Sequence, residues 1–296
     1  MTGKDNTGTA RRVTAMSAGD STVRPPFTEI RRFGELDSTN RYLLDEARAG
    51  AAAGLVVVAD HQTAGRGRLG RRWEAPAGTN LLVSVLLRPA LAVGDLHLVT
   101  VAVALAARTA CAEATGVEPS LKWPNDLMVG ERKLAGILAE AIAGGPGAGV
   151  PAVVVGMGLN VGWPGPDEVP AEAAVPAEAA VPAEAAVPAE LRAGATSLWR
   201  ESGRRVERAV VLELLLDHLG PRLDDLDDPD NPDGRDALVA EYGRACSTVG
   251  RAVTVSMATE TVTGTVTGIT AAGHLLVDVG GRTRTITAGD VVHLRG

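Results

Sequence analysis

Residues 96 to 114 read LHLVTVAVALAARTACAEA, and this run places the strongest constraint on how the chain folds. It contains neither glycine nor proline, the two residues that most disfavour a helix. Alanine, valine and leucine dominate it, and a helix that is apolar on all sides is buried. Only 3% of the whole chain is aromatic, so such small aliphatic side chains have to supply most of the core. We therefore predict a long internal helix that other elements cover.

Short runs on both sides of this helix predict β-strands, because they are aliphatic or β-branched and too short to be helices. They lie at 55–59 and 80–87 before the helix and at 120–123, 136–141 and 152–156 after it. The polar run Asp37-Ser38-Thr39-Asn40 offers N-cap residues for another helix, since apolar residues then recur at helical spacing. An amphipathic helix is predicted over 206–219, ended by Gly220-Pro221, with an acidic, proline-rich loop over 223–235.

The C-terminal part has a different texture. From residue 251 onward, short alternating segments are separated by glycines, at 253–255, 262–266, 275–279 and 283–286. This pattern is typical of a small, tightly turned β-barrel or sandwich. We therefore expect an α/β domain over residues 27–245 and a β domain over 246–296.

Two segments are predicted to lie outside these domains. Residues 1–26 are polar and lack the apolar stretch of a signal peptide, so we expect a disordered leader. The hexamer VPAEAA starts at Val169, Val175 and Val181, and a truncated copy starts at Val187. A proline every six residues breaks any helix, so we interpret residues 169–190 as a surface linker inserted in a loop. A docking segment is the alternative.

Composition excludes several classes of protein. The net charge of −7 argues against a general nucleic-acid binder, which needs a basic face. No uninterrupted apolar run reaches the roughly 18 residues of a membrane span. Cys111 and Cys246 lie far apart and form no zinc or disulfide pattern. No P-loop, serine-hydrolase elbow or zinc-protease motif occurs. We expect a soluble enzyme of the cytoplasm.

The densest chemical signal is Gly65-Arg66-Gly67-Arg68-Leu69-Gly70-Arg71-Arg72-Trp73. Several guanidinium groups in one loop repel each other unless an anion lies among them, and phosphate or carboxylate is the natural guest. The glycines also match a dinucleotide-binding pattern, but that pattern needs a helix directly afterwards, and Pro76 disfavours one here. A solvated basic turn is the remaining alternative.

Two further clusters follow along the chain. A turn and hairpin after Lys122-Trp123-Pro124-Asn125-Asp126 would bring Asp126 close to Lys133. A lysine there can neutralise charge that develops on a phosphate, and the carboxylate can hold a divalent ion. Gly156-Met157-Gly158-Leu159-Asn160 lets the backbone pass close to another segment or a ligand. Taken alone, the first cluster is better explained as an ordinary surface hairpin and the second as a plain turn at a strand end.

Taken in order, these motifs resemble those of the biotin protein ligases, also called biotin–[acetyl-CoA-carboxylase] ligases. The matching pieces are Asp37-Ser38-Thr39-Asn40, Gln62-Thr63-Ala64-Gly65-Arg66-Gly67-Arg68, Trp73, Lys122-Trp123-Pro124-Asn125-Asp126, Lys133-Leu134-Ala135-Gly136-Ile137-Leu138, Gly156-Met157-Gly158-Leu159-Asn160 and Ala195-Thr196-Ser197-Leu198. The resemblance implies an α+β fold, in which a mixed β-sheet with packed helices, as in class II synthetases and lipoate ligases, precedes a small SH3-like barrel. Residues 27–245 would then be the catalytic domain.

The resemblance also implies roles for single residues. The biotin pocket would be lined by Ser38, Thr39, Asn40, Gln62, Gly65, Arg66, Gly67, Arg68, Lys133 and Gly136. The nucleotide would contact Arg66, Arg68, Arg71, Trp73, Asn80, Asp126, Lys133 and Asn160. Lys133, Arg66 and Arg68 would take part in catalysis, and Asp126 would hold Mg²⁺.

The implied reaction forms biotinyl-5′-AMP from biotin and ATP and then transfers biotin to a lysine of a biotin carboxyl carrier protein. A lipoate- or octanoate-transferring enzyme of the same fold is the alternative, and one acting through a cysteine would need a suitably placed thiol. Some relatives carry an N-terminal winged helix and repress transcription. Only about 26 polar residues precede Phe27, so we expect the monofunctional class, without DNA binding, as a monomer or weak homodimer.

Overall fold

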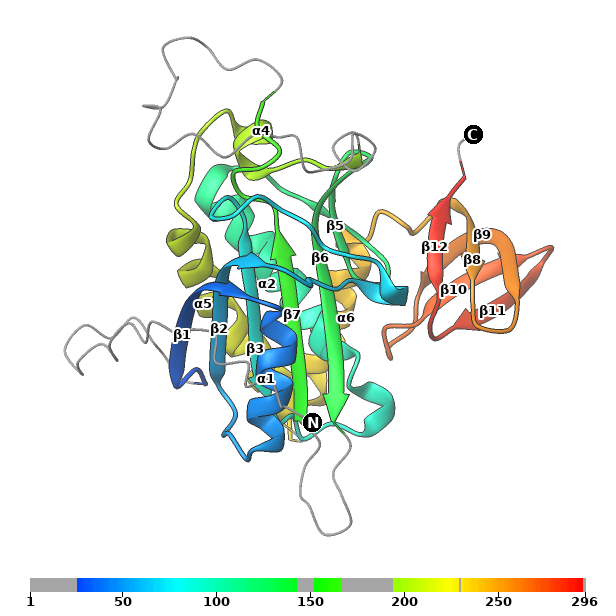
Figure 1. The fold of residues 1–296 in the computed structure, drawn as a ribbon. Helices are drawn as coiled ribbons and strands as arrows, with labels where there is room; N and C mark the ends of the chain where they lie inside the picture. The colour runs from blue at the N-terminus through cyan, green and yellow to red at the C-terminus, as the bar shows by residue number, and fades with distance from the viewer. Residues whose placement is uncertain (1–25, 143–151, 167–193, 229, 295–296) are drawn as a thin grey trace, which may run out of the picture.

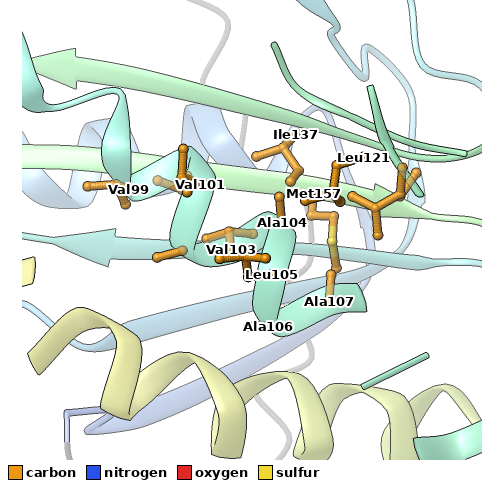
Figure 2. Packing of buried hydrophobic residues seen from close by; sticks show 14 of the residues in the cluster. Val99, Val101, Val103, Ala104, Leu105, Ala106, Ala107, Leu121, Ile137 and Met157 are labelled. Atoms are coloured by element: carbon orange, nitrogen blue, oxygen red, sulfur yellow. The ribbon is translucent and has the colours of Figure 1, made fainter. Parts of the chain in front are cut away.

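A long buried helix is present where the sequence predicts one. In the computed structural model, which describes residues 26–142, 152–166, 194–228 and 230–294, α2 (Leu98–Thr115) begins two residues later than the predicted run. Leu105 and Cys111 of this helix have no exposed surface. Figure 2 shows Ala104 and Ala107 facing Met157 of the neighbouring sheet. The small alanine side chains let the helix lie close to the strands, and the prediction of an internal helix is confirmed.

The helix lies against a mixed seven-stranded sheet (Figure 1). In spatial order the strands are β1 (Glu29–Leu36), β2 (Leu55–Gln62), β3 (Leu81–Leu87), β7 (Ala152–Leu159), β6 (Arg132–Ile142), β5 (Asp126–Val129) and β4 (Ser120–Lys122). Only β1 and β2 run parallel, and all other neighbours are antiparallel. Each predicted strand of this part is confirmed. The sequence gives no clear signal for β1, because this edge strand is largely exposed and carries few apolar residues.

Helices cover both faces of the sheet. On one face, α5 (Arg208–Asp227) and α6 (Pro232–Ala245) pack on α2. On the other face lies α1 (Thr39–Arg48), whose N-cap is Ser38, as the polar run predicts. The described residues also contain the short helical segments η1 (Arg68–Gly70), η2 (Val93–Asp95) and α4 (Leu198–Ser202).

Two predictions for the region before the β domain are wrong. The helix α5 does not end at Gly220-Pro221 but continues to Asp227, and much of the predicted loop 223–235 is helical. Pro221 removes one backbone hydrogen bond, but Leu219, Leu223 and Leu226 recur at helical spacing and are buried. This burial offsets the lost bond. Pro232 lies in the first turn of α6, where the missing N–H costs nothing.

The C-terminal part forms a separate antiparallel sheet of five strands. Its elements are β8 (Ala252–Ser256), β9 (Thr261–Ile269), β10 (Leu275–Val279), β11 (Arg282–Ile286) and β12 (Asp290–His293), in the order β11-β10-β9-β8-β12. The predicted small β domain is confirmed, with β12 as an additional strand. It contacts the larger domain through the turn before β10, where Trp123 Nε1 donates to the carbonyl oxygen of Gly273 at 3.2 Å.

Some sequence predictions lie outside the described residues, namely the leader apart from Pro26 and the repeat segment 169–190. Within the described part, Val93–Thr115 is the one helical stretch long and apolar enough to cross a membrane by length and composition. Of the most apolar part of this stretch, 67% is buried inside the protein. Burial of this extent is what a core helix shows.

Substitution Leu105→Ala should destabilise the protein by roughly 2–5 kcal/mol, because it opens a cavity between α2 and the elements packed on it. The free energy of unfolding from guanidinium denaturation measures this loss. Val93→Ala, at a side chain that is 78% exposed, is the control and should change stability by less than about 0.5 kcal/mol. A loss below about 1 kcal/mol for Leu105→Ala would contradict the packing described here.

Candidate active site

A cavity of about 660 Å³ lies between the start of α1, the loop of residues 65–73, the β5–β6 hairpin and the glycines of β7. Its volume is within the range of pockets that take drug-sized ligands. The structure brings most of the predicted site residues to its wall: Ser38, Thr39, Asn40, Gln62, Arg66, Gly67, Arg68, Arg71, Trp73, Asp126, Lys133 and Gly136. Residues that are up to about a hundred positions apart in the chain therefore meet here.

One end of the cavity is polar and uncharged. The backbone N–H and the hydroxyl of Thr39 donate to Gln62 Oε1 at 2.8 and 3.0 Å. Ser84 Oγ lies 2.7 Å from Thr39 Oγ1 and donates to Asn40 Oδ1 at 2.6 Å. The amide oxygens of Gln62 and Asn40 can only accept hydrogen bonds. The hydroxyl groups of Thr39 and Ser84 therefore supply two protons for the three oxygen–oxygen contacts. This end of the cavity is therefore rich in acceptors and suits a neutral ligand that brings N–H donors.

Ser84 was not among the predicted site residues, although it has no exposed surface and links Thr39 to Asn40. A usable signal was present in the sequence. Ser84 is the single polar residue of β3, whose other residues are leucine and valine. A buried polar side chain in such a strand has to find hydrogen-bond partners, and these lie beside a polar site.

The floor of the cavity is formed by backbone. A Cβ atom on Gly156 would lie 2.0 Å from Asn40 Oδ1, and one on Gly158 would lie 2.3 Å from the Trp73 ring. Neither distance is sterically possible, so these positions require glycine. The expectation that the Gly156–Asn160 motif permits close approach of another segment is confirmed for these two glycines.

Another part of the cavity wall carries charged side chains. The β5–β6 hairpin places Lys133 Nζ 2.6 Å from Asp126 Oδ1, so the predicted proximity of these residues is confirmed. The ammonium also lies 5.7 Å from the centre of the Trp73 ring, within reach of a cation–π contact. The Trp73 Nε1–H is buried and has no hydrogen-bond partner among the described residues. A ligand bound against this wall therefore meets the Lys133–Asp126 ion pair.

The loop of residues 65–73 folds back on itself. The N–H of Gly67 donates to the carbonyl oxygen of Arg71 at 2.7 Å, and the N–H of Trp73 donates to that of Gly65 at 3.0 Å. No long helix follows the glycines, which excludes the dinucleotide-binding alternative. Leu69, at the tip, has a φ of 56° and a 73% exposed side chain.

Two arginines of this loop reach the C-terminal domain. Arg68 donates to Asn125 Oδ1 at 3.3 Å and to the carbonyl oxygen of Gly289 at 3.2 Å. Arg71 forms an ion pair with Asp290, which also lines the cavity. Burial lowers the pKa of Arg68, and the nearby carboxylates of Asp290 and Asp126 oppose that shift. The loop is therefore held from both domains.

Three predicted residues do not line the cavity. Asn80 and Asn160 are buried and bind each other, with Asn80 Nδ2 donating to Asn160 Oδ1 at 2.9 Å. Asn80 Oδ1 also accepts from the N–H groups of Val161 and Trp163, both at 3.1 Å. Their amides thus fix the segment that follows β7, and direct contact with a nucleotide stays a prediction. Gly65 acts within the loop, because a Cβ there would lie 2.6 Å from the Trp73 carbonyl oxygen and a side chain would not fit.

Neither cysteine belongs to the site. Cys111 lies inside α2, and burial raises the pKa of its thiol to about 12. Cys246 ends α6, is 5% exposed, and burial likewise raises its pKa. Among the described residues, no three histidine, cysteine or acidic side chains gather into a metal-binding group.

Comparisons with known proteins agree with this geometry. Residues 33–160 match the biotin/lipoate A/B protein ligase family, and residues 248–294 match the biotin protein ligase C-terminal domain. The fold and the site thus define a ligase of the biotin and lipoate class. Over 267 residues, the chain is 37% identical to the biotin–[acetyl-CoA-carboxylase] ligase of Mycobacterium tuberculosis, covering 87% of this chain and 86% of that protein. The chain belongs to the biotin protein ligase family.

Other relatives support the same assignment. The bifunctional ligase/repressor of Bacillus subtilis is 33% identical over 181 residues, which cover 61% of this chain and 49% of that protein. Among solved structures, a biotin protein ligase from Aquifex aeolicus in complex with biotin and ATP superposes with a TM-score of 0.71. It is 25% identical, and the match covers 91% of this chain and all of that one. The predicted α+β fold with a small C-terminal β domain is confirmed.

In the folded protein, neither thiol should react with iodoacetamide at pH 8. At that pH a thiol with a pKa of about 12 is ionised in about one molecule in ten thousand, and the thiolate is the reactive form. Mass spectrometry should find both cysteines alkylated only after unfolding in guanidinium, which serves as the control. Rapid alkylation of Cys111 in the native enzyme would contradict its burial.

Proposed function

We propose that this protein activates biotin with ATP to form biotinyl-5′-AMP and then joins biotin to a lysine of a biotin carboxyl carrier protein or domain. The observation that carries the proposal is the polarity of the cavity. An uncharged, acceptor-rich part around Thr39 and Gln62 and a charged part around Lys133 belong to the same cavity. Biotin has the same two ends, namely a neutral ureido ring and a carboxylate.

In the proposed binding mode, the ureido N–H groups face the oxygens of Thr39, Asn40 and Ser38. These side chains are 4 to 5% exposed, so their positions are fixed before the ligand binds. Because these side chains are already ordered, binding costs less conformational entropy. The relative from Aquifex aeolicus, solved with biotin and ATP, supports the choice of ligands.

In the first step, a carboxylate oxygen of biotin attacks the α-phosphorus of ATP, the bond to pyrophosphate breaks, and pyrophosphate leaves. Both reactants are anionic, so cations have to offset their repulsion and hold them in line. We assign this role to Lys133, with Arg66 and Arg68 of the loop, and we assign Arg71 and Trp73 to nucleotide contacts. Lys133 is already ion-paired with Asp126, so the incoming carboxylate exchanges one anionic partner for another.

Mg²⁺ would accompany the ATP phosphates. This ion is commonly bound through one or two carboxylates, with phosphate and water supplying the other ligands. The Asp126 side chain, 21% exposed on the cavity wall, fits one such ligand, and the described residues form no larger metal site. The donor set therefore suits a metal that arrives with its substrate. When bound, the ion would neutralise phosphate charge.

In the second step, the amine of the carrier lysine attacks the carbonyl carbon of the mixed anhydride, and AMP leaves. The anhydride hydrolyses in water, so the loop of residues 65–73 serves the chemistry by covering it. We propose that the acceptor is a carrier domain, that the enzyme does not bind DNA, that it acts in the cytoplasm, and that it is a monomer or weak homodimer. The mycobacterial relative, a biotin–[acetyl-CoA-carboxylase] ligase, supports the choice of acceptor.

Isothermal titration of biotin and of lipoate, each with and without a non-hydrolysable ATP analogue, tests the proposed substrate. Biotin should bind and lipoate should not, because only biotin supplies N–H donors for the polar end of the cavity. Binding of lipoate alone would reject the proposal and leave the fold assignment intact.

Substitution Lys133→Ala should slow biotinyl-AMP formation by about 10²–10³-fold, as expected when a group that stabilises transition-state charge is removed. Pyrophosphate release measures the rate. Arg251→Ala is the matched control, since it removes a cationic side chain that pairs with Glu131 outside the cavity. An unchanged rate for Lys133→Ala in a folded protein would remove Lys133 from the mechanism.

A further inference from the structure

Glu140 is an acidic side chain that contacts two residues of the cavity wall, and the mechanism above does not use it. It lies on β6 opposite Val154 of β7, on the face of the sheet that α1 covers. Val154 is fully buried, and Ile142 packs in the same apolar cluster. The Glu140 side chain is 27% exposed, so its charge is partly desolvated and needs partners.

Its two carboxylate oxygens bind two different parts of the site. Oε2 accepts from Asn40 Nδ2 at 2.9 Å, and Oε1 lies 3.3 Å from Arg66 Nη2. Asn40 belongs to the first turn of α1 and is 5% exposed, whereas the Arg66 side chain is 48% exposed on the loop. One carboxylate therefore links the fixed, neutral end of the cavity to its cationic loop.

The contact with Asn40 also fixes which way its amide points. Asn40 Nδ2 faces Glu140 and the carbonyl oxygen of Leu138, at 2.9 and 3.1 Å, and both of these groups can only accept. The amide oxygen is thereby turned toward Ser84 Oγ, 2.6 Å away. A rotated amide would place oxygen against oxygen on the Glu140 side.

We propose that Glu140 is a positioning residue for biotin activation, which orients the Asn40 amide in the biotin pocket and anchors Arg66 of the loop. The inference rests on the proposed function. Arg68 donates to the carbonyl oxygen of Gly289 in the C-terminal domain, so the two arginines anchor the loop to different domains. Loss of the Glu140 charge releases only one of these anchors.

Two substitutions separate the two roles. Glu140→Gln keeps an oxygen that accepts from Asn40 but has no charge for Arg66. It should leave the KM for biotin within about twofold and release biotinyl-AMP about three- to fivefold faster, the size expected for a partly exposed ion pair. Glu140→Ala removes both contacts and should also raise the KM for biotin about tenfold, with a smaller change in kcat, because a hydrogen bond to a charged group is lost.

The full chain is assayed by pyrophosphate release at varied biotin and ATP, and by release of labelled biotinyl-AMP over time. Glu131→Gln, which breaks an exposed ion pair with Arg251, is the matched control and should behave as the unmodified enzyme. Thermal unfolding confirms that each variant is folded. A biotin KM for Glu140→Ala equal to that of the unmodified enzyme overturns the role in orienting Asn40, and normal retention by Glu140→Gln overturns the anchoring of Arg66. Failure of the proposed function differs from both, since the unmodified enzyme would then release no pyrophosphate with biotin.

Discussion

The site depends on a part of the sheet, in β6 and β7, where glycines leave the backbone without side chains. Gly136 and Gly158 pair across β6 and β7, and Gly156 lies two residues further along the same face. Their missing side chains leave room for the Trp73 ring and the Asn40 amide to rest on the sheet. In an antiparallel sheet, side chains normally cover such a face. The cavity exists because three positions on this face are glycines.

The second dependency is between the domains. The loop that carries Arg68 and Arg71 has few apolar contacts of its own, since Leu69 at its tip is exposed. Its arginines instead bind Gly289 and Asp290, at the turn that leads into β12. The C-terminal domain therefore supports the larger domain's loop, which explains how a barrel without predicted site residues contributes to the site.

Local patterns in the sequence predicted much of this molecule. The apolar run of α2, the hairpin that joins Asp126 to Lys133, and the glycines of β7 all follow from composition or spacing. Effects of long-range packing were not predictable in this way. The sequence does not show that buried leucines continue α5 past Pro221, or that Asn80 and Asn160 bind each other. These outcomes depend on partners 80 or more residues away in the sequence.

Charge explains why these long-range partners matter. The chain carries a net charge of −7, yet the loop of residues 65–73 gathers four arginines, and three of them are held by carboxylates: Glu140, Glu74 and Asp290. Each carboxylate comes from a different segment, so the repulsion within the loop is offset from several directions. An anionic ligand supplies a competing partner for the same guanidinium groups. Binding can then rearrange the loop by exchanging ion pairs of similar strength, which needs less free energy than bringing unpaired cations together.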